Sequence, residues 1–159
     1  MTLFFWIMLP ILLLGMAALG AYLIMTMGDN AAPDISTTGR LNASQLAQIA
    51  ANAGFTDQDL ATAVAVALAE SGGKIDAYNP ETAAGTPEGK GSYGLWQIYL
   101  KVHPEYTPAA LLDPQTNANA AYKIYQQRGE TFAAWSTYTN GAYLAHATEA
   151  SGATGFELA

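Results

Sequence analysis

The chain has 159 residues, a length that suits one modest domain. Its formal net charge of −7 disfavours binding to nucleic acid, and the lack of cysteine excludes disulfides and thiolate metal sites. All thirteen acidic and all six basic residues lie from Asp29 onward, so an uncharged beginning is followed by a charged remainder.

Residues 3–27 are apolar except for Thr26 and a few small residues. A helix of this length, at about 1.5 Å per residue, exceeds the ~30 Å hydrocarbon core of a bilayer. Trp6 and Tyr22 lie near its two ends, where aromatic residues meet a membrane interface. We therefore predict a single transmembrane anchor over residues 1–28, which contacts lipid through residues 3–27.

The alternative for this segment is a cleaved signal peptide, with Ala18-Leu19-Gly20 as the cleavage site. No Lys or Arg precedes that site, however, and residues 22–25 remain apolar beyond it. The first basic residue is Arg40, so flanking charge does not indicate an orientation in the membrane. The Gly, Pro, Asn and Ser content of residues 29–39 predicts a linker.

The remaining residues, 40–159, are predicted to form one mainly helical domain. Apolar periodicity, capping residues and glycine stops predict helices at residues 43–53, 57–70, 114–128, 131–136 and 141–150. Thr56 followed by Asp59 is similar to a capping box at the start of the second helix. Between residues 72 and 114, a long helix is excluded by Gly85, Pro87, Gly89, Gly91 and Gly94. We predict a loop region there, with room for a short hairpin, across a cleft from Glu70.

Glu70 ends an apolar helical run, Ala61–Ala69, and precedes Ser71-Gly72-Gly73. An apolar environment raises the pKa of a carboxyl group, and a helix end beside a loop is open to substrate. Such an acid can donate a proton near neutral pH. Considered alone, Glu70 is better interpreted as a solvated acid at a helix end, and only the other motifs favour the catalytic role.

Three segments place aromatic or amide side chains beside glycine, at residues 69–73, 91–98 and 135–143. Aromatic faces and amide groups suit a sugar, which offers both C–H faces and hydroxyls. In composition and order the segments resemble the motifs of the lysozyme-like domain of soluble lytic transglycosylases and goose-type lysozymes. The resemblance covers Leu41 to His146 and is strongest to small versions in bacteriophage particle and tail proteins.

Glu70-Ser71 matches the first family motif, Gly94-Leu-Trp-Gln97-Ile the second, and residues 138–141 resemble the third, usually Ala-Tyr-Asn-Ala-Gly. The resemblance implies that Glu70 is the catalytic acid and then the base, and that Tyr138 positions it. The implied substrate-binding residues are Ser71, Tyr93, Gln97, Tyr138 and Asn140. Thr139 stands where the family usually has Asn, which weakens the assignment of Asn140.

The resemblance implies cleavage of peptidoglycan glycan strands with no cofactor and no metal. A lytic transglycosylase needs a single carboxylate, whereas a hydrolytic lysozyme needs a second acid, for which Asp76 and Glu81 are the nearest downstream candidates. Neither lies in a clear motif, so we expect a lytic transglycosylase that forms a 1,6-anhydro product, with a hydrolytic lysozyme as the alternative. An inactive wall-binding or structural membrane protein is a further alternative. The expected location is a membrane with the domain facing peptidoglycan, in a phage virion or a bacterial envelope.

Some of these residues also have purely structural interpretations. Trp96 and Trp135 could both belong to the core, the common position of tryptophan in a small helical domain. Gln97 could be a buried amide that bonds to backbone rather than to sugar. His103 and His146 lack the spacing of metal ligands and are interpreted as surface or cap residues.

Overall fold

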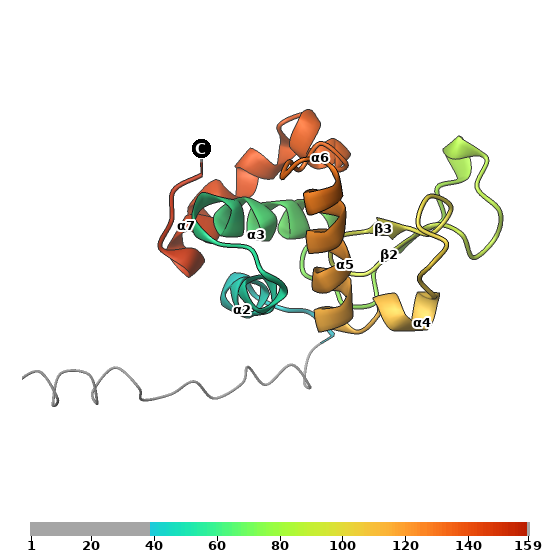
Figure 1. The fold of residues 1–159 in the computed structure, drawn as a ribbon, viewed down its shortest axis with the longest axis horizontal. Coiled ribbons are helices and arrows are strands. Elements are labelled where there is room, and N and C mark those ends of the chain that lie inside the picture. The colour runs from blue at the N-terminus through green and yellow to red at the C-terminus, as the bar shows by residue number, and fades with distance from the viewer. Residues whose placement is uncertain (1–38, 159) are drawn as a thin grey trace, which may run out of the picture. The chain divides into compact units, whose positions relative to one another are not determined.

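The computed structural model describes residues 39–158, which form a mainly helical domain with one small sheet (Figure 1). Its elements in chain order are α2 Ala43–Ala53, α3 Asp57–Ser71, β1 Tyr78–Asn79, η1 Thr82–Ala84, β2 Ser92–Tyr93, β3 Ile98–Tyr99, α4 Pro108–Leu111, α5 Pro114–Gln127, α6 Ser136–Thr139, η2 Ala142–His146 and α7 Ala147–Thr154. The predicted mainly helical class is confirmed. The predicted anchor over residues 1–28 and nearly all of the linker lie outside the described residues.

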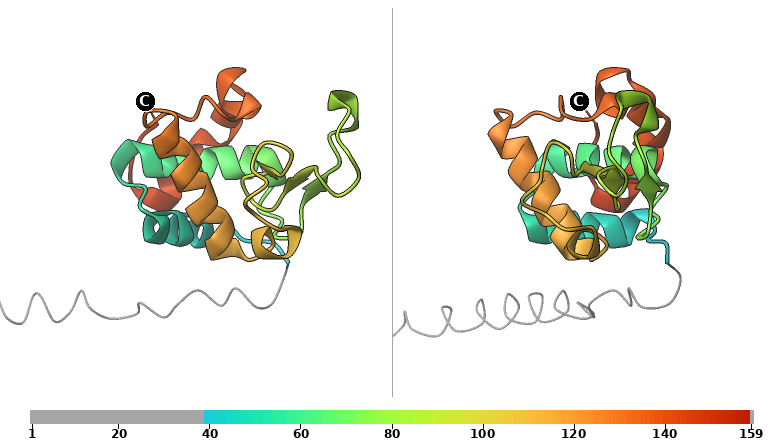
Figure 2. Two further views of the ribbon diagram at one scale, coloured as in Figure 1. Left: turned by 45° about the vertical axis from the view of Figure 1, so that its right-hand side comes forward. Right: turned by 90° about the vertical axis from the view of Figure 1, so that its right-hand side faces the viewer.

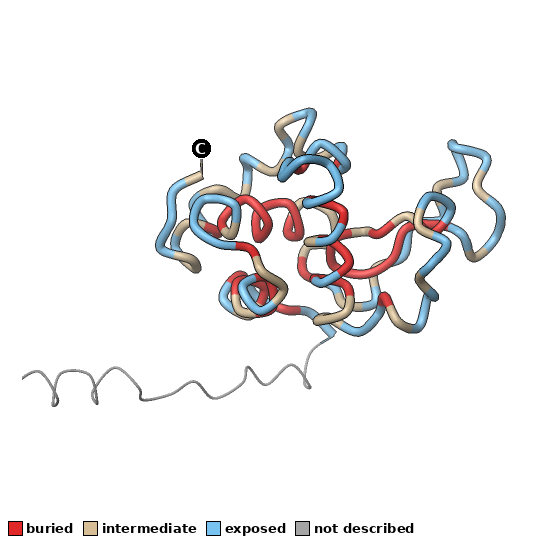
Figure 3. The backbone as a smooth tube through the Cα atoms, in the orientation of Figure 1, coloured by how far each residue is buried: buried red, intermediate tan, exposed pale blue. Residues whose placement is uncertain are grey.

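Helix α3 lies at the centre of the domain, and α2, α6, η2 and α7 all pack against it. Every residue from Ala61 to Leu68 is buried, as the red stretch of this helix shows (Figure 3). Alanine at alternate positions lets neighbouring elements approach closely on all sides. The helix ends at Gly72, whose left-handed backbone returns its N–H to the Leu68 carbonyl. After this buried run, the last turn of the helix, which contains Glu70, is only half-buried.

Helix α2 has the predicted bounds and is capped by a true capping box between Asn42 and Gln45. Its predicted inward residues Leu46, Ile49 and Ala50 are all buried. The capping box predicted for α3 is wrong, because the Thr56 side chain makes no hydrogen bond to the helix. The burial of α3, rather than its cap, holds this helix in place.

The glycine-rich region forms an antiparallel sheet in the order β1-β2-β3. Tyr78 pairs with Tyr93, and Ser92 pairs with Tyr99. The loop between β1 and β2, which carries η1, extends away from the helices (Figure 1 and the left view of Figure 2). The short hairpin predicted for this region is confirmed, whereas α4 was not predicted.

Buried hydrogen bonds fix the Gly94–Gln97 segment between α3 and α5. Asn117 of α5 donates to the carbonyls of Tyr93 and Leu111 and accepts from the Trp96 N–H. The Trp96 indole donates to the Ala63 carbonyl at 3.0 Å, and the Trp135 indole donates to the Trp96 carbonyl at 2.7 Å. Both tryptophans are core residues, and their hydrogen bonds join α3 to the second and third motif segments.

The C-terminal elements differ from the prediction. The helix predicted at residues 131–136 is wrong, because Trp135 has an extended backbone and α6 begins only at Ser136. Burial of Phe132 and Trp135 determines this path. The single helix predicted at residues 141–150 is divided into η2 and α7. Within residues 39–158, no helix is long and apolar enough to span a membrane.

Candidate active site

Glu70 is half-buried in the last turn of α3. Loss of hydration through burial raises the pKa of its carboxyl group above the ordinary value of 4.5. Hydrogen bonds from the Thr137 hydroxyl and backbone N–H lower this pKa, and the charge of Glu81 raises it, so that the net direction is upward. Glu70 therefore retains its proton to a higher pH than a solvated glutamate.

Thr137 is the residue that touches the Glu70 carboxyl group. Its Oγ1 donates to Glu70 Oε1 at 2.7 Å, across 67 positions of the chain. Tyr138, which the motif pointed to, packs its ring against Phe132 at 5.6 Å and Tyr143 at 4.9 Å. Sequence reasoning missed Thr137, because the third motif usually has alanine at this position and a contact across 67 positions leaves no local signal.

The polar side chains of Ser71 and Gln97 form hydrogen bonds mainly with backbone groups. The Ser71 hydroxyl donates to the Ala67 carbonyl and accepts from the Gly73 N–H, which closes the end of α3. The Gln97 amide nitrogen donates to the carbonyls of Ala77 and Gly94. These bonds leave the Gln97 carbonyl oxygen as the atom that could accept from a sugar hydroxyl. The predicted role of both residues in substrate binding stays a prediction.

The exposed aromatic face on the sheet belongs to Tyr78 rather than Tyr93. Tyr93 is 9% exposed and its hydroxyl donates to the Gly89 carbonyl, whereas Tyr78 is 45% exposed. The two rings lie 4.6 Å apart, so Tyr78 covers Tyr93. A Cβ on Gly91 would come within 2.1 Å of the Asn79 backbone carbonyl oxygen, which explains the glycine beneath this pair of rings. Sequence reasoning missed Tyr78, because exposure of a tyrosine depends on its cross-strand neighbour.

Asn140 is exposed after α6, and its side-chain oxygen accepts from the Ala142 N–H at 2.9 Å. This bond caps the turn that leads into η2 around Gly141, which has a left-handed backbone. The geometry brings Asn140 to the turn rather than to the Glu70 carboxyl group. Its predicted contact with substrate stays a prediction.

Glu81 is the second carboxylate that acts on Glu70. Its Oε1 accepts from Ser92 Oγ at 2.8 Å and from Asn79 Nδ2 at 3.1 Å. Its backbone has φ +51°, a left-handed conformation that non-glycine residues rarely adopt. Asp76, the other sequence candidate, is exposed. The sequence did not distinguish Asp76 from Glu81 as the possible second acid. In the structure Glu81 is the one that is held by hydrogen bonds and whose charge acts on Glu70.

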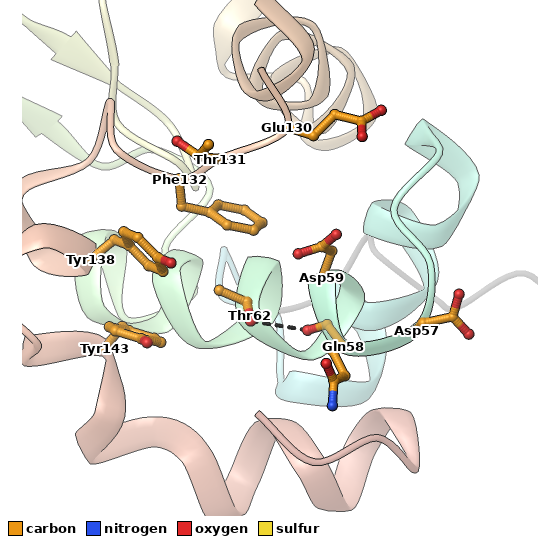
Figure 4. A pocket seen from close by; sticks show the side chains of 9 residues that line it. All are labelled: Asp57, Gln58, Asp59, Thr62, Glu130, Thr131, Phe132, Tyr138 and Tyr143. Atoms are coloured by element: carbon orange, nitrogen blue, oxygen red, sulfur yellow. Dashed lines mark hydrogen bonds between the residues drawn. The ribbon is translucent and has the colours of Figure 1, made fainter. Parts of the chain in front are cut away.

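A cavity of about 430 Å³ lies beside the N-terminal half of α3 (Figure 4). Tyr138 and Tyr143 line one side and Asp57 and Asp59 line the other. Asp59 accepts from the Tyr125 hydroxyl at 2.6 Å, and burial together with this bond raises the pKa of Tyr125. Glu70 does not line this cavity. Within residues 39–158, no group of three or more acidic or histidine side chains could hold a metal ion.

A family described as a lysozyme-like domain matches residues 47–137, which is more than half of the chain. The chain therefore belongs to this lysozyme-like domain family, and the resemblance drawn from the motifs is confirmed. The matched range contains Glu70, the Gly94–Gln97 segment and Thr137. No curated protein and no solved structure matches the chain.

Glu70→Gln should increase the free energy of unfolding, relative to the unchanged protein, more at about pH 8 than at about pH 4. Because burial raises the folded-state pKa of Glu70, the native state binds this proton more tightly than the unfolded state. The stability it contributes is therefore complete below the ordinary pKa and is lost as pH rises through the folded-state pKa. Glutamine has no such titration.

Urea unfolding of the full-length protein across this pH range measures the difference. Glu88→Gln is the matched control, because Glu88 is exposed in the loop after η1. A stability difference between Glu70→Gln and the unchanged protein that is constant with pH would contradict the raised pKa.

Proposed function

We propose that this protein cleaves the glycan strand of peptidoglycan at the MurNAc-GlcNAc β-1,4 bond, with Glu70 as the proton donor. The observation that carries the proposal is the Glu70 carboxyl group itself. It is half-buried at the end of a central helix, its pKa is raised, and Thr137 holds one of its oxygens within a lysozyme-like domain.

The first step follows from the protonation of Glu70. Its carboxylic acid gives the proton to the glycosidic oxygen as the C–O bond to the muramic acid ring breaks, and positive charge develops on that ring. The ionised Glu70 that remains lies close to this charge and stabilises it. The exposed ring of Tyr78 offers an apolar face on which a sugar ring can stack.

For the second step we propose transglycosylation. The Glu70 carboxylate takes the proton from the muramic acid 6-hydroxyl, whose oxygen bonds to C1 and closes a 1,6-anhydro ring. The acid form of Glu70 is thereby restored and no water is consumed. This route is supported by its need for only one carboxylate, because Glu70 alone ends an apolar helix within a recognised motif.

Hydrolysis is the second candidate, and Glu81 is the observation that favours it. The hydrogen bonds from Ser92 and Asn79 hold the carboxylate of Glu81, and its charge acts on Glu70. A carboxylate fixed in this way could remove a proton from a water that attacks C1. The product would then carry a reducing end instead of an anhydro ring.

Glu70→Gln should lower the rate of cell-wall clearing by the full-length protein by a factor of about 100 or more, because glutamine cannot donate the proton. Zymography on purified peptidoglycan measures this loss, with Glu88→Gln as the control that keeps activity. Equal clearing by Glu70→Gln and the unchanged protein would exclude Glu70 as the acid. If the unchanged protein clears no wall at any pH, the alternative of a wall-binding or structural membrane protein is favoured.

Mass spectrometry of the digest should find anhydromuramic ends, because in the proposed second step the 6-hydroxyl attacks C1 in place of water. Glu81→Gln is the diagnostic variant. Under transglycosylation it should keep the anhydro product and most of the rate, whereas under hydrolysis it should lose the reducing ends and about 100-fold in rate. Reducing ends from the unchanged protein would overturn the transglycosylase assignment.

We further propose that residues 3–27 anchor the enzyme in a membrane with the domain facing peptidoglycan. The uncharged sequence of this segment supports the anchor. The compact domain and its resemblance to phage-borne versions support a virion enzyme that opens the cell wall during entry. A bacterial envelope enzyme would have the same layout.

The anchor predicts that the full-length protein stays with membranes during carbonate extraction. Leu13→Lys combined with Leu14→Lys should release it, because each lysine at a bilayer centre costs about 2.5–3.5 kcal/mol. Release of the unchanged protein into the supernatant would contradict the anchor.

A further inference from the structure

Helix α6 carries a threonine, Thr137, where the third motif usually has alanine, and the hydroxyl of this side chain contacts Glu70. Thr137 precedes Tyr138 directly, and its Oγ1 lies 2.7 Å from Glu70 Oε1. This distance is typical of a hydroxyl that donates to a carboxylate. The contact is therefore specific to the side chain at position 137 and does not follow from the motif.

We propose that Thr137 is a positioning residue that holds one carboxyl oxygen of Glu70, so that the other oxygen carries and delivers the proton. An oxygen that already accepts a hydrogen bond is the less favourable place for the acid proton. The hydrogen bond from the Thr137 hydroxyl to Oε1 therefore favours the acid proton on Oε2, the other oxygen of the Glu70 carboxyl group. The catalytic part of this inference rests on the proposed function of Glu70.

The position of the Thr137 hydroxyl is determined by buried structure. Trp135, two residues earlier, is 5% exposed, and its indole donates to the Trp96 carbonyl. The N–H groups of Tyr138 and Thr139 both return to the Trp135 carbonyl, which closes α6 around Thr137. Because threonine is branched at Cβ, its χ1 angle is restricted as well. The core thus fixes the hydroxyl against the carboxyl group.

Opposing effects act on Glu70 at this position. Burial and the charge of Glu81, which comes from the loop after β1, raise its pKa, whereas the hydroxyl and backbone N–H of Thr137 from α6 lower it. A group that serves first as an acid and then as a base works best with a pKa near the operating pH. Thr137 limits the rise and so keeps the ionised form of Glu70 accessible for the second step.

The test compares Thr137→Val, which keeps the shape and loses the hydroxyl, with Thr137→Ser, which keeps the hydroxyl. On glycan strands of defined length, Thr137→Val should lose about tenfold in kcat with little change in KM. The alkaline limb of its pH profile should move up by about one pH unit, because the lost bond stabilised the charged form. Thr137→Ser should restore both quantities toward those of the unchanged protein.

Thr139→Val is the matched control on the same helix, since the Thr139 hydroxyl donates to the Ser136 carbonyl and is exposed. It should leave kcat and the pH profile unchanged. A loss of activity in Thr137→Val with no shift of the alkaline limb would mean a purely structural role and would overturn the proposal. Equal impairment of Thr137→Ser and Thr137→Val would overturn it as well.

A second readout separates this inference from the proposed function. Carbon-13 NMR of the Glu70 carboxyl group in the full-length protein measures its pKa without substrate. A higher pKa in Thr137→Val than in the unchanged protein supports the positioning contact, even if neither protein cleaves peptidoglycan. An unchanged pKa would overturn the contact, whatever the activity assay finds.

Discussion

The burial of α3 is the constraint on which the rest of the domain depends. Its residues from Ala61 to Leu68 have neighbours on every side, so the helix cannot rotate or shift without opening the core. Glu70 follows this buried run within the last turn, and its position is therefore set by packing. The same packing removes water from the carboxyl group, which makes proton retention a consequence of the core.

Two tryptophans attach the other parts of the site to α3 through buried hydrogen bonds. The Trp96 indole bonds to the α3 backbone, and the Trp135 indole bonds to the Trp96 backbone. Segments far apart in the sequence are thus joined by buried hydrogen bonds, which a low-dielectric interior strengthens. The hydroxyl of Thr137 reaches Glu70 at the end of this chain of contacts.

The loop after β1 carries a charge whose effect on the pKa of Glu70 opposes that of Thr137. Glu81, held by Ser92 and Asn79, adds a negative charge that favours the protonated form of Glu70. A neighbouring charge of the same sign disfavours ionisation of Glu70, and so adds to the rise in its pKa that burial causes. In the proposed transglycosylation, Glu81 acts only on the pKa of Glu70. In the hydrolytic alternative, Glu81 also removes a proton from the water that attacks C1.

The sequence by itself determined the helical class, the bounds of α2, and Glu70 as the acid to consider, because apolar periodicity and glycine stops are local signals. It could not rank Asp76 against Glu81, nor choose Thr137 over Tyr138 as the partner of Glu70. Those decisions depend on contacts across 11 and 67 positions, which local patterns do not encode. Only tertiary packing decided them, since the burial of Trp135 and the pairing of β1 with β2 set where each polar group lies.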